Sequence, residues 1–262
     1  MPVSDRDLLE ETAREAGEIA TSFWREDPQV WDKGGDDPVS EADFAVDTHL
    51  KQRLLAARPD YGWVSEETED DPARLEAERV FIVDPIDGTR SFVAGEKTWA
   101  HSLAVAEHGR IIAACVFLPV REKLYLAEKG GGATLNGNSL SAVDRDRLEG
   151  AAVLSPKVNF RPEFWKVSPP DVKRHFRPSL AYRMALVGEG RFDAMITLRP
   201  AWEWDIAAGA LIAEEAGARV YDRHGAELTF NSPSRQTAGV VTGGRKVTEA
   251  LFSRLKDTEY PA

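Results

Sequence analysis

A short apolar stretch that runs straight into clustered aspartates constrains this chain more than any other feature. Residues 80–83 read Val-Phe-Ile-Val, and residues 84–89 read Asp-Pro-Ile-Asp-Gly-Thr. β-Branched and aromatic residues favour a strand. Pro85 fixes a turn, and Gly88 allows a backbone conformation that other residues avoid. We therefore expect a buried strand that ends at Asp84 and presents two carboxylates at one turn.

Several uses of such a turn can be compared on spacing. A plain Asp-Gly turn at the surface is the simplest one. A calcium-binding hand requires oxygen ligands at alternate positions before its glycine, and Pro85 and Ile86 break that alternation. A phosphatase with an aspartate nucleophile would place its acids in a D-x-D pattern, whereas this chain has D-x-x-D. Metal binding is the functional use that the spacing favours.

Three other segments supply acids that could converge on the same point. Glu66 ends a short apolar run, Asp43 lies near the start of an expected helix, and Asp205 opens another. Each alone has an ordinary explanation, because an acid in the first turn of a helix interacts favourably with the helix dipole. Taken together they predict a carboxylate cluster.

The composition excludes several classes of protein. The 262 residues carry a formal net charge of −11 and are 42% hydrophobic, which is typical of a soluble globular chain and unsuited to a nucleic acid polymer as partner. The longest apolar run, residues 111–118, is far below the roughly 20 residues that span a bilayer, so no membrane association is expected. The N-terminal residues lack a secretory pattern. The single cysteine, Cys115, is expected to be a buried core residue, and a cytoplasmic location is expected.

Hydrophobic periodicity predicts a helix-and-antiparallel-sheet half followed by an α/β half. Helices are expected at 4–24, 41–57, 179–189, 204–216 and 245–256, with a short one starting at Thr89. Strands are expected at 61–65, 79–83, 100–107, 110–118, 123–128, 151–154, 193–198 and 238–242.

The chain resembles the inositol monophosphatase superfamily, the magnesium-dependent, lithium-sensitive phosphatases that include bisphosphate nucleotidases and fructose bisphosphatases. The likeness extends over nearly the whole chain and rests on segments 38–43 (Pro-Val-Ser-Glu-Ala-Asp), 65–67 (Ser-Glu-Glu), 84–89, 136–137 (Asn-Gly), 190–193 (Gly-Arg-Phe-Asp) and 203–209 (Glu-Trp-Asp-Ile-Ala-Ala-Gly). It implies an α/β fold, a layered αβαβα sandwich. Residues 1–145 would form an α+β half with most metal ligands, and residues 146–262 an α/β half with Asp205 and the substrate-recognition segment.

The resemblance also implies roles for individual residues. Two or three Mg²⁺ ions are expected as cofactors, and carboxylate and carbonyl oxygens are the ligands that this hard cation prefers. By this likeness the first ion would be held by Glu66, Asp84 and the carbonyl of Ile86, and the second by Asp84, Asp87 and Asp205. Asp43 and Thr89 would orient and activate the attacking water, and the amides of Gly88 and Thr89 would hold the phosphate. Hydrolysis of a phosphate monoester follows from this assignment.

The segment from Ser155 to Arg183 bears on the substrate. It contains seven basic residues against two acids, a local charge of +5, together with five aromatic side chains. Such a mixture suits a nucleotide with an additional phosphate, through charge-assisted hydrogen bonds and base stacking. A solvated loop whose aromatic residues pack on the protein body is the alternative. Candidate specificity residues are Lys157, Arg161, Arg183 and Glu203.

A second clue concerns the position seven residues before Asp205. Inositol monophosphatases typically carry a glutamate there to bind ring hydroxyls, whereas this chain has Leu198, although Arg199 or Glu203 could take over that role. The favoured substrate is therefore 3′-phosphoadenosine 5′-phosphate, hydrolysed by a 3′(2′),5′-bisphosphate nucleotidase. Inositol monophosphate or another sugar phosphate is the alternative. A non-catalytic regulatory protein is a third hypothesis, disfavoured because every expected acid is present. The partner is a small anionic phosphate ester, and the resemblance also allows a homodimer.

Overall fold

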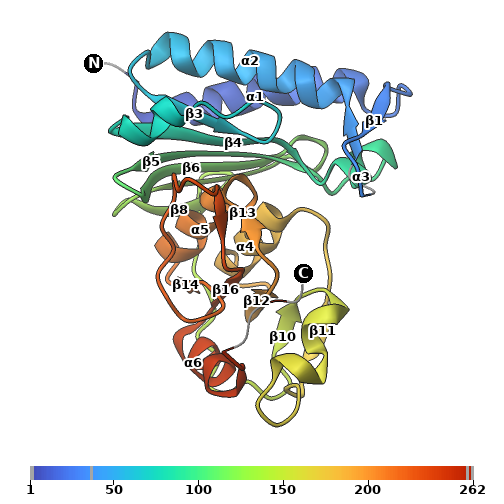
Figure 1. Ribbon diagram of the computed structural model, residues 1–262, viewed down its shortest axis with the longest axis vertical. Coiled ribbons are helices and arrows are strands. Elements are labelled where there is room, and N and C mark those ends of the chain that lie inside the picture. Colours follow the sequence, from blue (N-terminus) through green and yellow to red (C-terminus); the bar gives the residue numbers. More distant parts are fainter. Residues whose placement is uncertain (1–2, 36–37, 258–259, 261–262) are drawn as a thin grey trace.

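Two long helices cover one face of a large sheet and form the outer layer of the molecule (Figure 1). They are α1 (Asp5–Phe23) and α2 (Glu41–Ala57) in the computed structural model, which describes residues 3–35, 38–257 and 260. The Ser4 hydroxyl caps α1 by accepting a hydrogen bond from the amide of Asp7 at 3.1 Å. Leu9 and Leu50, which are fully buried, belong to the core cluster that joins these helices to the sheet. Both helices were expected within a residue or two.

The large sheet has seven strands in sequential order. They are β3 (Gly62–Ser65), β4 (Arg79–Asp87), β5 (Ala100–Glu107), β6 (Arg110–Leu118), β7 (Lys123–Glu128), β8 (Gly132–Leu135) and β9 (Asn138–Ser139). The pair β3–β4 is parallel and the remaining pairs are antiparallel. The expected hairpin of β5 and β6 is confirmed, and Cys115 is buried in β6 as expected.

The end of strand β4 differs from the one expected from the sequence. The chain does not leave the sheet at Asp84, because β4 continues to Asp87, with a register shift against β5 between these two residues. Pro85 has no backbone N–H to contribute to a ladder, and irregular pairing is where a sheet accommodates such a residue. The irregularity brings both aspartates to the end of the strand.

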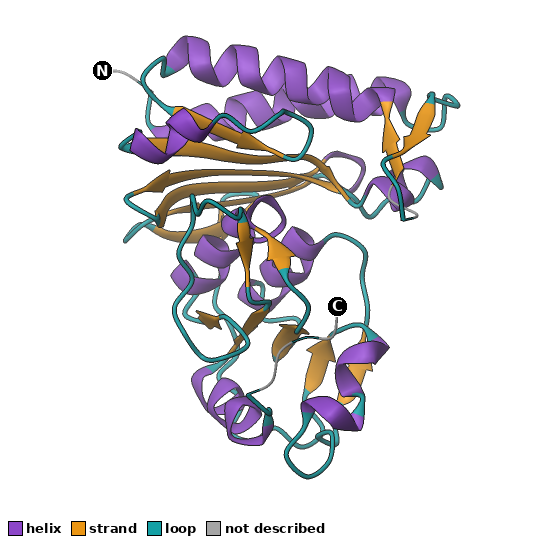
Figure 2. Ribbon diagram, in the orientation of Figure 1, coloured by secondary structure: helices purple, strands orange, loops and turns teal. Residues whose placement is uncertain are grey.

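Helices α4 (Leu180–Gly188) and α5 (Glu203–Glu215) lie between the large sheet and a second one (Figures 1 and 2). The second sheet has the order β11 (Lys173–His175), β10 (Ala152–Leu154), β12 (Ala194–Thr197), β16 (Val240–Gly243) and β14 (Arg219–Tyr221). Strands β10, β11 and β12 are parallel, and β16 runs antiparallel to both of its neighbours. Helix α6 (Arg245–Arg254) and two 3₁₀ turns, η3 (Lys157–Phe160) and η4 (Pro162–Phe164), lie outside it. The expected αβαβα layering is confirmed.

Several short elements had no counterpart among the predicted ones. They include β1 (Val30–Asp32), β2 (Pro38–Ser40), η1 (Pro72–Glu76), η2 (Pro119–Arg121), β13 (Ala201–Trp202) and β15 (Gln236–Thr237). The short helix expected to start at Thr89 is confirmed as α3 (Thr89–Val93). Strands of two or three residues are too short to display an alternating pattern. Their pairing is decided by the tertiary fold, which joins β1 to β2 and β13 to β15.

One large apolar core connects the two proposed halves of the chain. It includes Val64 and Val116 of the large sheet, Leu186 of α4, Ile212 of α5 and Val240 of the second sheet. The middle helices therefore bury apolar side chains toward both sheets, and a division at residues 145 and 146 stays a prediction. Among the described residues, no helix has the length and apolar character required to cross a membrane.

Candidate active site

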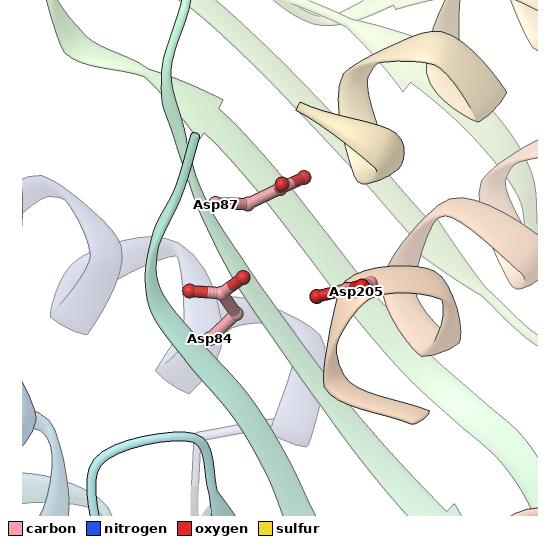
Figure 3. A group of neighbouring side chains, drawn as sticks. All are labelled: Asp84, Asp87 and Asp205. Atoms are coloured by element: carbon pink, nitrogen blue, oxygen red, sulfur yellow. The ribbon is translucent and has the colours of Figure 1, made fainter. Parts of the chain in front are cut away.

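Three aspartates meet where the irregular end of β4 faces the start of α5 (Figure 3). One carboxylate oxygen from each of Asp84, Asp87 and Asp205 lies within 4.8 Å of the others. Asp84 and Asp87 come from one strand, and Asp205 comes from a helix more than a hundred residues later. The fold thus brings together three of the five acids that the sequence singled out, in a group compact enough to hold a metal ion.

The electrostatics of this triad favour a cation. Burial raises the pKa of Asp84 well above its ordinary value, and the negative charges of Glu66, Asp87 and Asp205 raise it further. The pKa of Asp205 is raised by burial and then by Asp87 and Glu66. Oδ1 of Asp84 is buried and has no hydrogen-bond partner among the described residues. Because buried polar atoms are normally paired, this atom points to a ligand.

Asp87 is held by the start of α4. Its carboxylate accepts hydrogen bonds from the hydroxyl of Ser179 at 2.7 Å and from the amides of Leu180 at 3.1 Å and Ala181 at 2.7 Å. Burial raises the pKa of Asp87, and these three donors oppose the rise. The N-terminus of α4 therefore fixes the orientation of an acid that lies 92 residues before Ser179 in the chain.

Asp43 and Thr89 form a hydrogen-bonded pair close to the triad. The hydroxyl of Thr89 is 3.1 Å from Oδ1 of Asp43 and 3.0 Å from the carbonyl oxygen of Ile86. The other carboxylate oxygen of Asp43 accepts hydrogen bonds from the amide and the hydroxyl of Ser40, at 2.9 and 2.5 Å. Burial raises the pKa of Asp43, against the effect of Ser40 and Thr89. The acid and hydroxyl expected to act on water are thus in contact.

The loop between Asp87 and α3 exposes the backbone near this pair. Gly88 is the N-cap of α3 and has φ 103°, in the left-handed region that glycine adopts most readily. Free amides at such a turn can approach an anion closely.

Comparison with known proteins decides the family. The model described as "Inositol monophosphatase family" matches residues 4–258. The chain belongs to the inositol monophosphatase family. Members of this family are metal-dependent phosphatases, so the chain is a hydrolase that acts on phosphate monoesters.

Individual relatives of this family member carry different names. An inositol-1-monophosphatase of Rhizobium meliloti is 34% identical over 256 residues, which are 91% of this chain and 88% of the relative. A Nus factor SuhB of Pseudomonas aeruginosa is 31% identical, with 93% of each chain covered. A solved IMPase from Thermotoga maritima has a TM-score of 0.82 and 28% identity, and the match covers 94% of each chain.

Glu66 lies on the loop after β3, where a lysine covers it. Nζ of Lys33 is 3.0 Å from Oε1 of Glu66 and 2.6 Å from Oε1 of Glu67. Burial raises the pKa of Glu67 to about 7, and its hydrogen bond to Lys33 opposes that rise. Burial lowers the pKa of Lys33, but the charge of Glu66 and the bond to Glu67 outweigh it, so that the pKa is raised overall. Sequence reasoning missed Lys33, because its acidic partners lie 33 and 34 residues away in the chain.

Asp47 is a second residue whose role in the site the sequence did not predict. Its carboxylate accepts hydrogen bonds from the hydroxyls of Ser65 and, at 2.6 Å, Thr68. These residues flank Glu66, so Asp47 anchors the loop that carries it to α2. Its spacing of four residues from Asp43 was visible in the sequence, but only the fold shows what offsets its charge.

Among the four candidate specificity residues, Arg183 of α4 lies at the triad. Its side chain is buried and its charge interacts with Asp87 and Asp205. Nε is 3.4 Å from the carbonyl of Ser179, while Nη1 is buried without a hydrogen-bond partner among the described residues. The guanidinium lies 5.2 Å above the ring of Phe176, which is 47% exposed.

The other three candidates have different surroundings. Lys157 begins η3, after β10, and Arg161 is exposed and lies 3.8 Å from Glu163. The surroundings of Glu203 differ from those expected of a residue that contacts the substrate. Its side chain is fully buried, and both carboxylate oxygens accept hydrogen bonds from Asn231 and Ser232. A carboxylate committed in this way to a loop is not available to a substrate.

Proposed function

We propose that this phosphatase removes a phosphate from a nucleotide that carries two phosphates, with 3′-phosphoadenosine 5′-phosphate as its preferred substrate, and that Mg²⁺ is its metal. The observation that supports the metal site is the triad of Asp84, Asp87 and Asp205, whose acids are desolvated and mutually repulsive. The proposed ligands are those three side chains, Glu66 and the carbonyl of Ile86. All are oxygen donors, the set that fits Mg²⁺ rather than a thiophilic metal.

When bound, Mg²⁺ lowers the pKa of a water molecule and offsets negative charge on the phosphoryl oxygens. The residues of the chain handle the remaining steps. The hydroxyl of Thr89 orients the attacking water, accepts a proton from it and donates its own proton to Asp43. The raised pKa of Asp43 makes it a better proton acceptor than an exposed aspartate. The amides of Gly88 and Thr89 hold the phosphate. The oxygen of the water forms the new P–O bond as the ester P–O bond breaks, and the leaving alkoxide takes up a proton from solvent to become the alcohol, while the proton of the water goes to Asp43 by way of Thr89.

The substrate proposal is supported by Arg183 and Phe176. Nη1 of this buried guanidinium has no hydrogen-bond partner in the described part of the chain and requires an acceptor, and a second phosphate of the substrate provides charged oxygens. Phe176 presents a half-exposed ring in contact with that guanidinium, which is a surface on which a base can stack. Leu198 is buried and apolar, so it has no group to bind the hydroxyls of inositol.

Replacement of Asp87 tests the site. Asp87→Asn should lower kcat at least about a thousandfold, because it removes a proposed metal ligand while the amide oxygen still accepts bonds from α4. Phosphate release and circular dichroism should be measured together, with the exposed Asp146→Asn as the control. Full activity in a folded Asp87→Asn variant would overturn the assignment.

The substrate is tested by comparing kcat/KM for three compounds: 3′-phosphoadenosine 5′-phosphate, inositol 1-phosphate and histidinol phosphate. The third is included because a Chlorobaculum parvum relative, 31% identical over 97% of this chain, is named a histidinol-phosphatase. We expect the nucleotide to be preferred, with inhibition by Li⁺. Preference for inositol 1-phosphate would favour the alternative of an inositol monophosphatase, and inactivity on every compound would favour a regulatory role.

The variant Arg183→Met tests whether Arg183 binds the second phosphate of the substrate. Loss of a charge-assisted hydrogen bond should lower kcat/KM for the bisphosphate by about 10- to 100-fold, and less for inositol 1-phosphate, which has one phosphate. Arg183→Lys serves as the matched control, because it keeps the charge and loses the planar geometry. Equal losses on both substrates would contradict the assignment of Arg183 to a second phosphate.

A further inference from the structure

A buried polar network lies behind the triad and has no part in the mechanism above. Glu203 is the first residue of α5, two positions before Asp205, and its side chain is fully buried. Its carboxylate accepts hydrogen bonds from the amide of Asn231 at 2.6 Å, and from the amide and hydroxyl of Ser232 at 2.9 and 2.6 Å. The beginning of α5 is thereby fastened to the loop at 231–232.

Arg74 connects that same loop to the loop of Glu66. Its side chain is 1% exposed. Nη1 donates to Oδ1 of Asn231 at 2.6 Å, and Nη2 donates to the carbonyl of Ser232 at 3.0 Å. Nε donates to Oδ1 of Asp70 at 2.6 Å, and the second oxygen of Asp70 lies 3.2 Å from Nη2. Asp70 stands four residues after Glu66 on the connection between β3 and η1.

Further contacts close the network around the same loop. The amide of Asn231 Nδ2 donates to the carbonyl of Arg74 at 3.2 Å. The backbone amide of Glu203 donates to the carbonyl of Arg235 at 2.9 Å. The Arg235 guanidinium lies 3.7 Å from Asp70 and 5.9 Å from the ring of Trp204, the residue between Glu203 and Asp205.

The network therefore connects two segments that are far apart in the sequence, the loop of Glu66 and the start of α5. Asp205 belongs to the triad and Glu66 lies on the loop after β3, and a continuous series of hydrogen-bonded groups joins their segments through Asp70, Arg74, the loop at 231–232 and Glu203. Buried charged groups in such a series are strongly held because each loss leaves a desolvated partner unsatisfied. Groups behind a metal site that orient its ligands commonly change metal affinity without touching the metal.

We propose that Glu203 and Arg74 are positioning residues that set the separation between Glu66 and Asp205 and thereby tune the affinity of the metal site. This inference rests on the proposed metal site. It assigns Glu203 a part in arranging the ligands in place of a contact with the substrate, and it makes the loop at 231–232 a structural component of the active site.

Mg²⁺ binding by the full chain without substrate provides the test. Isothermal titration calorimetry should show that Glu203→Gln weakens Mg²⁺ binding about tenfold or more, the effect expected for a group behind a metal ligand. Ser232→Ala removes the hydroxyl bond to Glu203, together with a longer contact to the hydroxyl of Ser234, and should weaken binding about two- to threefold. This variant keeps the test valid if Glu203→Gln does not fold. Arg74→Lys keeps the charge but cannot bridge Asp70 and Asn231 together, so it should weaken binding as well.

The matched control is Glu189→Gln. Glu189 is an internal acid that accepts bonds from Lys123 at 2.9 Å and from Tyr125 at 2.5 Å, but it caps the C-terminal end of α4, away from the triad. It should lower the unfolding temperature and leave the Mg²⁺ dissociation constant unchanged.

The outcomes separate the two proposals. Dissociation constants within twofold of wild type for folded Glu203→Gln, Ser232→Ala and Arg74→Lys would overturn the positioning role. The metal site itself is tested by Asp84→Asn, which should abolish binding. If Asp84→Asn binds Mg²⁺ as wild type does, the proposed site fails, and the inference fails with it.

Discussion

Four aspartates at this site are desolvated, and they differ in the groups that compensate their charge. Asp87 receives three donors from the start of α4, and Asp43 receives donors from Ser40 and Thr89. Asp205 experiences the positive charges of Arg199 and Arg183. Oδ1 of Asp84 has no donor among the described residues. The uncompensated atom belongs to the aspartate whose pKa is raised by burial and by Glu66, Asp87, Asp205 and Asp43 together, which is where a cation would offset the most charge.

His101 shows how a single residue supports the strand that carries these acids. It is fully buried in β5, and Nδ1 lies 2.5 Å from the carbonyl oxygen of Pro85. A carbonyl only accepts hydrogen bonds, so Nδ1 carries the proton, and Nε2 is buried without a partner among the described residues. Protonation of Nε2 would place a charge in this apolar position, and burial accordingly lowers the pKa of His101 to about 4.

This depressed pKa predicts acid sensitivity. Between about pH 6.5 and pH 4 the histidine is protonated in the unfolded chain and neutral in the folded chain. The contribution of His101 to the free energy of unfolding is therefore fully present above pH 6.5 and decreases as the pH falls, by about 3 kcal/mol at pH 4. His101→Asn keeps a donor and does not titrate. Urea unfolding in EDTA, at pH 7.5 and 4.5, should show that the free-energy advantage of wild type over the variant shrinks by about 2 kcal/mol. Parallel pH profiles would contradict this assignment.

At the scale of elements, the site depends on how secondary structures begin and end. β4 ends in an irregularity that contains Pro85, α3 begins at a left-handed Gly88, and α4 and α5 begin facing the triad. Helix N-termini supply amide donors and favour negative charge. The acids of β4 are therefore met by two helix starts and one turn.

Gly88→Ala tests the turn at α3. A Cβ at this position would lie 3.4 Å from the carbonyl oxygen of Thr98 and 3.5 Å from the amide of Ser179, at a φ of 103°. We expect a loss of about 1 kcal/mol in stability from the backbone strain, and a loss of about tenfold or more in kcat/KM because the phosphate-binding amides are displaced.

Gly130→Ala is the matched control for that variant. Gly130 has a φ of 76° and no atoms within 4 Å of the added Cβ, so it carries the same type of backbone penalty in the turn between β7 and β8. Phosphate-release kinetics should show normal activity for Gly130→Ala. Equal losses of activity in the two variants would mean that strain alone, and not the placement of the amides, explains the effect at Gly88.

At the scale of the whole molecule, the site is assembled from segments between residues 43 and 205. Asp43 lies on α2, Glu66 follows β3, Asp84 and Asp87 end β4, and Asp205 lies on α5. A ligand bound by the folded chain and not by the unfolded chain stabilises every segment that holds it.

Mg²⁺ should therefore raise the unfolding temperature. At a concentration about 100 times the dissociation constant the gain is about 2.7 kcal/mol, which for a chain of this size corresponds to roughly 5–10 °C. Differential scanning calorimetry in Mg²⁺ and in EDTA at matched ionic strength provides the measurement. Asp205→Asn should largely remove the difference. A wild-type unfolding temperature that is independent of Mg²⁺ would contradict a metal site that joins these segments.

Sequence reasoning recovered the main helices, the hairpin of β5 and β6 and the layered fold, because apolar periodicity and turn residues are local signals. It placed the end of β4 too early at Asp84, because a proline usually ends a strand and only pairing with β5 shows that this one continues. It also treated Glu203 as a substrate contact, since its partners at 231–232 are distant in the chain.

The sequence by itself determined the chemistry of the site: which acids are present, in what order, and that they are oxygen donors suited to a hard cation. The tertiary structure alone decided which groups compensate them. The donors on Asp87, the cover of Lys33 over Glu66, the anchor at Asp47 and the link from Glu203 to Arg74 all join residues that no local pattern relates. Charge and residue type are properties of one position, whereas desolvation and hydrogen bonding depend on which segments the fold packs together.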